Sequence, residues 1–338
     1  MKRLKFIILT VLAGMAISCS EDMLELDPLG EYSETAVWQD PALAELFANG
    51  IYDAMDIPYA KYMQMCFTDE GHRRDNSDMT NFNNCIISPD NIPGWLKGEG
   101  HQRIIWNELY AIVRKCNILL SNIDRLPDDN AKVDGFTKKE RLKGEGHFLR
   151  AWTYMYLTNL YGGVPVVDKV YTLEDEFMIP RDTYEDCIRF ITDDCDKAAT
   201  LLPITHSGDN NGRATKGAAL ALKSRILTYA ASDLHNEFTF SGYSNPEYVK
   251  YTTGNQRDRW VAAKNASKAV MDMNVYALYK ESPAPSDSIA QNFVDLFLAG
   301  LNTSEDIFIR YFASRLVPYN NNILNNNNPN GYHGGGNN

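Results

Sequence analysis

Segments of helix length, each with an apolar stripe, follow one another along most of this chain. Leu109, Ile112 and Cys116 show the pattern, because apolar side chains three or four residues apart share one helix face. The same spacing predicts helices over 41–55, 101–124, 137–161, 183–202, 214–232 and 256–274. Strand patterns are short, at 164–167 and 307–312. The sequence therefore predicts a mostly α fold, a superhelix of tetratricopeptide-like helical hairpins joined by long irregular loops.

Local signals fix the ends of several of these helices. Thr137 and Glu140 have the spacing of a capping box, in which each side chain bonds the other residue's backbone N–H. Thr183 stands in the same position before the next helix. Gly162 and Pro165 mark a helix end, because glycine adopts the left-handed cap conformation and proline cannot continue a helix. These signals favour distinct hairpins over one long helix.

The charge balance narrows the class of partner. The chain has 338 residues, with 33 Lys and Arg against 44 Asp and Glu, for a net charge of −11. Such an acidic chain lacks the basic surface that nucleic-acid binding requires, so no nucleic-acid partner is expected. The length is sufficient to bury a large core without disulfide staples. Cys116 and Cys187 lie within helical patterns and are predicted to be buried, whereas Cys66 and Cys85 remain candidates for a bridge.

The first residues have the pattern of a secretion signal. Three basic residues precede an apolar run over 6–17, which is too short to span a membrane as a helix. The run ends at Ser18 and Cys19, a small residue before cysteine, as in bacterial lipoprotein signals. We therefore expect 1–19 to be a lipoprotein signal with Cys19 lipidated, although an ordinary cleaved signal remains the alternative. Residues 20–40 are polar and are expected to form an extended tether.

Several ordered motifs resemble the SusD/RagB family of outer-membrane nutrient-binding lipoproteins of Bacteroidetes. They lie at 19–30, 49–52, 106–117, 144–154, 161–165 and 212–225. The resemblance implies a helical-repeat protein over 41–318, anchored by lipid in the outer membrane and facing the cell exterior. It also implies capture of oligosaccharides or polysaccharides for a SusC-like TonB-dependent transporter as the partner. Family members are longer, so the Asn- and Gly-rich stretch 319–338 is expected to be a loop at which the chain is cut short.

The segment 57–97 lacks clear periodicity and mixes aromatic with polar side chains. Long irregular loops in compact domains are commonly functional. A sugar offers apolar C–H faces to aromatic rings and hydroxyl groups to planar polar side chains. We therefore expect a ligand-binding site formed by Trp95, Arg73, Asn83, Asp69, Phe82 and Tyr59. Two alternatives stay open: the aromatic residues only hold this loop to the helical body, or a second insertion with Tyr243, Tyr248 and Tyr251 binds instead.

Motifs for catalysis, metal binding and cofactors find little support. The sequence has no G-x-S-x-G or H-E-x-x-H pattern, and its six His residues lack ligand spacing. The motif 144–150 is interpreted as packing and capping, with Arg150 bonded to a neighbouring carbonyl or carboxylate. We therefore expect no enzyme activity, catalytic residue, metal or cofactor. The alternative to glycan binding is a protein-interaction module that holds a transporter or a peptide without any sugar.

Overall fold

The computed structural model describes residues 34–55, 81, 83–87, 91, 106–128, 130–237, 242–280, 286, 288, 290–299 and 303–309. The longer helices are α3 (Pro41–Ala54), α6 (Trp106–Asn122), α7 (Lys138–Tyr161), α8 (Tyr184–Leu201), α9 (Lys216–Ala231), α10 (Gln256–Met271) and α11 (Gln291–Leu298). The short elements are α2 (Glu34–Val37), β1 (Lys132–Val133), β2 (Phe136–Thr137) and the 3-10 turns η3 (Ile123–Arg125), η4 (Gly208–Asn210), η5 (Asp233–His235) and η6 (Pro246–Tyr248).

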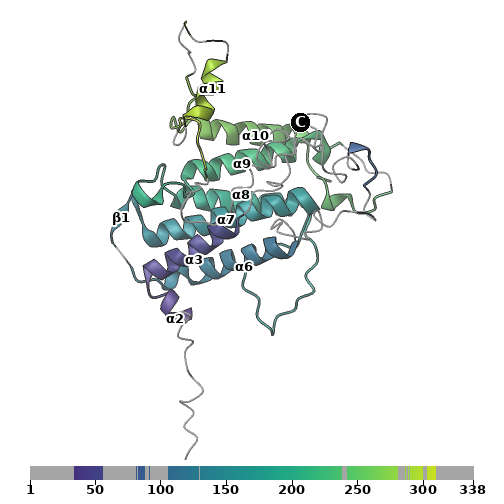
Figure 1. The fold of residues 1–338 in the computed structure, drawn as a ribbon. Coiled ribbons are helices and arrows are strands. Elements are labelled where there is room, and N and C mark those ends of the chain that lie inside the picture. The colour runs from purple at the N-terminus through teal and green to yellow at the C-terminus, as the bar shows by residue number, and fades with distance from the viewer. Residues whose placement is uncertain are drawn as a thin grey trace, which may run out of the picture.

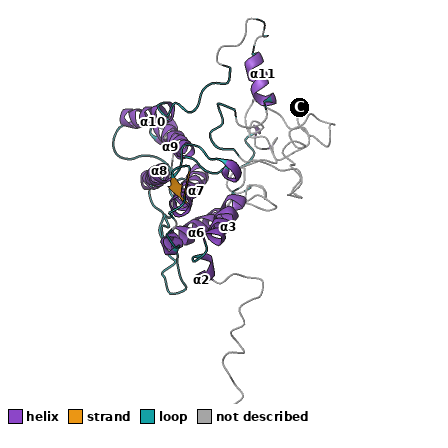
Figure 2. Ribbon diagram, turned by 90° about the vertical axis from the view of Figure 1, so that its left-hand side faces the viewer, coloured by secondary structure: helices purple, strands orange, loops and turns teal. Residues whose placement is uncertain are grey.

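Helices α6 to α10 lie side by side in chain order, each packed on the next (Figure 1). Gly144 of α7 lies against Leu202, and Arg150 bonds Asp194, so α7 and α8 run antiparallel. Helix α3 packs across α6 and α7. Figure 2 shows α11 standing apart from this stack. The predicted mostly α stack of helical hairpins is confirmed.

The predicted helix caps form as the sequence indicates. The Thr137 hydroxyl accepts a hydrogen bond from the Glu140 N–H at 3.2 Å, and the Glu140 carboxylate accepts one from the Thr137 N–H at 2.8 Å. Thr183 caps α8 by accepting a bond from the Asp186 N–H at 3.1 Å. Gly162 ends α7 with a φ of +73°, a conformation that glycine adopts without steric cost. These caps set where the hairpins turn.

One continuous apolar core runs through the stack. Its largest fully buried side chains are Trp38, Tyr154, Tyr184 and Phe148. Helix α9 packs on α10, and small residues predominate among the buried residues of both: Ala263 and Ala266 are the buried residues of α10, and α9 buries several alanines beside Leu222 and Ile226. Among the described residues, no helix is both long and apolar enough to cross a bilayer.

Two local predictions differ from the structure. Residues 164–167 do not form a strand, because their backbone groups bond side chains: Val166 N–H donates to Asp182, and Val167 N–H donates to the Tyr154 hydroxyl, both at 2.7 Å. Of the second predicted strand, residues 307–309 are not in a strand and the rest lies outside the described residues.

The expected tether 20–40 also differs from the structure at its end. Residues Glu34–Val37 form a helical turn, and Trp38 is buried with its ring 5.4 Å from that of Phe47. An indole gains free energy on leaving water, which holds this end of the segment on the body. The rest of the expected tether, 20–33, lies outside the described residues, as do the expected signal 1–19 and the tail 319–338.

Cys116 and Cys187 are buried, as predicted, and burial raises the pKa of the Cys116 thiol to about 12 and that of Cys187 to about 11. Cys85 is exposed and unpaired, and Cys66 lies outside the described residues.

Two helical glycines should respond in opposite ways to substitution. Gly50 of α3 has open space around it, so Gly50→Ala is expected to raise the free energy of unfolding by about 0.5–1 kcal/mol through helix propensity. A Cβ on Gly144 of α7 would lie 2.9 Å from Leu202 Cγ. Gly144→Leu is therefore expected to lower stability by about 1–3 kcal/mol through overpacking. Urea unfolding measures both, and equal effects at the two positions would contradict the packing described here.

Candidate functional site

The six predicted ligand-binding residues fall almost entirely outside the described part of the chain. Tyr59, Asp69, Arg73, Phe82 and Trp95 lie there, and the structure does not test them. The sixth residue, Asn83, is described and its side chain is exposed.

The described residues that flank the segment 57–97 are firmly placed. Tyr52, in the last turn of α3, accepts a hydrogen bond from the Ala214 N–H at 3.0 Å, beside the start of α9. Trp106, the first residue of α6, donates its backbone N–H to the Tyr161 hydroxyl at 3.1 Å, at the end of α7. Because α7 and α9 both run antiparallel to α8, these two anchors lie at opposite ends of the stack.

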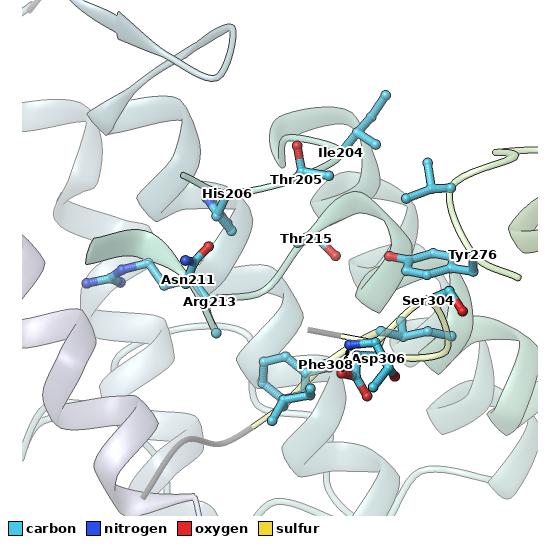
Figure 3. A pocket seen from close by; sticks show the side chains of 15 residues that line it. Ile204, Thr205, His206, Asn211, Arg213, Thr215, Tyr276, Ser304, Asp306 and Phe308 are labelled. Carbon is cyan, nitrogen blue, oxygen red and sulfur yellow. Dashed lines mark hydrogen bonds between the residues drawn. The ribbon is translucent and has the colours of Figure 1, made fainter. Parts of the chain in front are cut away.

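A pocket of about 240 Å³ lies between the α8–α9 loop and the chain near 275 and 303–309. Its lining is Ile204, Thr205, His206, Asn211, Gly212, Arg213, Thr215, Val275, Tyr276, Thr303, Ser304, Asp306, Ile307, Phe308 and Ile309. Figure 3 shows Tyr276 and Ser304 across the pocket from His206 and Asn211, with the Tyr276 hydroxyl pointing toward Thr215. The pocket therefore combines hydroxyl groups, an amide and apolar side chains.

Arg213, which lines the pocket, belongs to an ion cluster that joins three parts of the fold. Arg213 bonds Glu145 of α7 at 2.9 Å and contacts Glu45 of α3 at 3.3 Å. Arg141 bonds Glu145 at 2.6 Å and also pairs with Glu45. Lys138 pairs with the second oxygen of Glu45 at 2.8 Å. Because Arg213 pairs with carboxylates of both α3 and α7, the cluster holds the α8–α9 loop against these two helices.

Burial and pairing shift the pKa values around this cluster. Burial by itself raises the pKa of Glu45, but hydrogen bonds from Lys138 and Arg141 outweigh it and hold that pKa below its usual value. Burial lowers the pKa of His206, against the effect of its hydrogen bond to Ala214. The His206 ring is therefore neutral at pH 7, while Glu45 is ionised.

A second network holds α6, α7 and α8 together. Arg150 donates to Asp194 from Nε at 2.7 Å and from Nη2 at 2.9 Å, and to the Asn117 side-chain oxygen at 2.7 Å. His147 Nδ1 lies 2.8 Å from the same carboxylate. Burial acts to raise the pKa of Asp194, but the bonds from Arg150 and His147 outweigh it and lower that pKa. The interpretation of Arg150 as a residue that binds a carboxylate is confirmed.

Nothing in the described residues points to catalysis or metal binding. No group of three or more His, Cys, Asp or Glu side chains is placed to hold a metal ion among them. Two of the carboxyls whose pKa is lowered, Glu45 and Asp194, are each paired with an arginine that joins helices. The second insertion proposed from the sequence contains Tyr243, Tyr248 and Tyr251. The Tyr251 ring is covered by the Arg259 guanidinium and the Tyr248 ring by that of Arg181, whereas Tyr243 is exposed.

Sequence reasoning missed the pocket. Its residues come from three stretches separated by about sixty and about thirty positions, and no periodicity links them. One sequence signal near the pocket was available: Asp134-Gly135 is a dipeptide typical of the two-residue turn of a β-hairpin. That turn forms between β1 and β2, and the Asp134 carboxylate accepts bonds from Ser207 N–H and hydroxyl, both at 3.1 Å. The hairpin thus braces the loop that lines the pocket.

Comparison with known proteins gives a consistent result. A family model described as SusD-like, starch-binding and associating with the outer membrane matches residues 31–228. A SusD-like protein of Formosa agariphila is 25% identical over 242 residues, covering 68% of this chain and 43% of the relative. A SusD-like protein of Bacteroides fragilis, known as a crystal structure, is 27% identical with a TM-score of 0.55, covering 75% of this chain and 42% of that one. The chain thus spans less than half the length of these relatives.

The antiparallel stack of helices has the tetratricopeptide-like helical fold of the SusD-like structure to which it is similar. The family match covers more than half of the chain, within which lie the helices α3 to α8 and most of α9. The chain belongs to the SusD-like family, whose members are described as starch-binding and associated with the outer membrane. The predicted family membership is confirmed.

Proposed function

We propose that this protein is a non-enzymatic glycan-binding lipoprotein of the outer membrane. It is anchored through a lipid on Cys19 and faces the cell exterior. There it captures oligosaccharides and delivers them to a SusC-like TonB-dependent transporter. The observation that carries this proposal is the family match over 31–228. The family is described as starch-binding and associated with the outer membrane, and the matched range includes the segment 57–97.

The binding site proposed for this activity is the segment 57–97. Trp95, Phe82 and Tyr59 provide aromatic faces for sugar rings, and Asp69, Arg73 and Asn83 provide hydrogen-bonding groups for the hydroxyls. Stacking on one or two rings gives weak binding, which suits a protein that hands its ligand on. The helix stack contributes a firm base, since both flanks of the segment are bonded to it at Tyr52 and Trp106.

Affinity electrophoresis of the whole chain against a panel of polysaccharides tests this proposal. We expect one or more polysaccharides to retard the wild type and Trp95→Ala to lose most of that retardation, because the Trp95 indole is the largest aromatic face that the segment offers to a sugar ring. Trp260→Ala is the matched control, since Trp260 is an exposed tryptophan of α10 outside the segment. Unchanged retardation of Trp95→Ala would remove that residue from the site, and no retardation of the wild type would remove the function.

A second candidate function is binding of a protein partner without any glycan. It is favoured by the loop between α7 and α8, where Leu173, Phe177 and Met178 are exposed among acidic residues. Exposed apolar groups of this kind commonly mark protein contacts. Co-purification with a β-barrel transporter, together with no retardation by any polysaccharide, would favour this function over glycan capture.

A further inference from the structure

The loop between α7 and α8 presents apolar side chains to solvent. Leu173 is 96% exposed, Met178 86% and Phe177 59%. Glu174 and Glu176 alternate with them in the sequence and are exposed as well. Single exposed apolar residues are ordinary, but three within six positions form a patch, and apolar patches with a polar rim mark contacts between proteins. The loop tip, residues 173–178, is therefore an apolar surface with an acidic rim.

Hydrogen bonds from α6 hold this loop in place. The Arg114 guanidinium donates to the Tyr171 carbonyl oxygen at 2.9 Å. The Asn117 side-chain amide donates to the carbonyl oxygens of Val167 at 2.9 Å and Lys169 at 3.0 Å. A partner that binds the loop tip therefore meets a loop that is already ordered, which removes one of the costs of association.

Helix α10 carries a surface of the opposite charge. Trp260 is 45% exposed and Val261 46%. Arg257 and Lys264 are exposed beside them, and all four share one helix face because they are three or four positions apart. Neither of these two cations forms an ion pair with another described residue. The α10 stripe, residues 257–264 on this face, is thus apolar with a basic rim, in a chain whose net charge is −11.

The loop tip and the α10 stripe belong to opposite ends of the row of helices α6 to α10. The loop is bonded to α6, which begins the row, and α10 ends it (Figure 1). When two copies lie side by side and antiparallel, the loop tip of each meets the α10 stripe of the other, so one two-fold axis forms both contacts. Apolar residues within rims of opposite charge are the arrangement of an interface between proteins. We propose that these two surfaces bind a second copy of this chain.

Sedimentation equilibrium of the whole chain, over concentrations from about 5 to about 500 µM, tests the proposal. We expect a monomer–dimer equilibrium with a Kd of about 100 µM, because each contact is small and small interfaces are weak. The chain is then monomeric at the low micromolar concentrations of unfolding experiments. Leu173→Ser removes an apolar side chain that is already exposed, so the variant should fold normally and raise the Kd about fivefold.

Charge reversal on each surface gives a sharper test. Glu174→Lys with Glu176→Lys makes the loop tip basic, and Arg257→Glu with Lys264→Glu makes the α10 stripe acidic. Each double variant alone places like charges at both contacts, so each should raise the Kd by about tenfold or more. An equimolar mixture of the two double variants should dimerise again, because every contact of the mixed dimer joins opposite charges. Lys132→Glu is the control and should leave the Kd unchanged, since Lys132 is exposed on β1, at the other end of α7 from the loop.

Each outcome decides for or against the second copy. A chain that stays monomeric at all of these concentrations would overturn the proposal, as would a dimer that both double variants leave unchanged. Double variants that remain monomeric when mixed would overturn the pairing of these two surfaces, and assemblies that grow beyond the dimer would overturn the two-fold arrangement. Co-purification with a transporter through the loop tip, by a chain that does not self-associate, would assign the loop to that partner instead.

Self-association is independent of the proposed glycan capture, since the loop tip and the α10 stripe both lie outside the segment 57–97. Both double variants should keep their retardation by polysaccharide, measured against their own mobility in a gel without ligand. A wild type that no polysaccharide retards, but that dimerises as described, would remove glycan capture and support self-association.

Discussion

Asp194→Ala is expected to lower the free energy of unfolding by about 3–5 kcal/mol, among the largest effects of any single substitution in the described helices. Asp194 is 1% exposed and takes two hydrogen bonds from Arg150, whose side chain is 5% exposed. Removing the carboxylate leaves a buried guanidinium that keeps only its bond to Asn117. Helix α8 then loses its bonds from Arg150 and His147 of α7. Urea unfolding followed by far-UV circular dichroism measures the loss.

The neighbouring aspartate provides the control for Asp194. Asp193 lies on the same helix with the same chemistry but is exposed, so Asp193→Ala should change stability by less than about 0.5 kcal/mol. A double variant, Arg150→Met with Asp194→Leu, should recover part of the loss, because replacing both members of a buried ion pair by apolar residues is often nearly neutral. Equal stability of the two single variants would contradict the network described for Asp194.

Glu145→Ala is the second substitution with a large expected effect, again about 3–5 kcal/mol. Glu145 is fully buried and accepts bonds from Arg141 at 2.6 Å and from Arg213 at 2.9 Å. Without Glu145, Glu45 is the one carboxylate of the cluster that remains for the guanidinium groups of Arg141 and Arg213. The α8–α9 loop, which carries Arg213, is then held less firmly on α7.

Glu174→Ala is the control for Glu145, since Glu174 is exposed in the loop between α7 and α8. Thermal unfolding is measured on both variants. If Glu145→Ala were as stable as Glu174→Ala, the ion cluster would not hold the loop.

The helix stack could be predicted from the sequence because its signals are local. The Thr137–Glu140 capping box and the Gly162 cap act over three or four residues, and the apolar stripe of α6 needs only the helical period. Arg150 could be assigned to a neighbouring carbonyl or carboxylate because a buried guanidinium requires an acceptor. Its partner, Asp194, lies 44 positions away, so the pairing itself needed the structure.

The remaining differences come from contacts that no local pattern records. Residues 164–167 have the composition of a strand, yet side chains from Tyr154 and Asp182 take their backbone bonds. Trp38 follows a polar stretch, and only its contact with Phe47 shows that the end of 20–40 belongs to the body. The pocket combines three distant stretches, which composition does not bring together. The proposed glycan site rests on the chemistry of its side chains and on family membership, and Asn83 is the one of its six residues within the described part of the chain.

Hydrogen exchange of the whole chain, measured by mass spectrometry with and without a bound polysaccharide, tests the central claim most directly. Amides slow their exchange where a ligand covers or orders the backbone. We predict added protection in peptides from 57–97, around Tyr59, Phe82 and Trp95, with the helices α8 and α10 unchanged. Protection confined to other segments, with 57–97 exchanging as fast as in the free protein, would contradict the claim that this segment captures glycan.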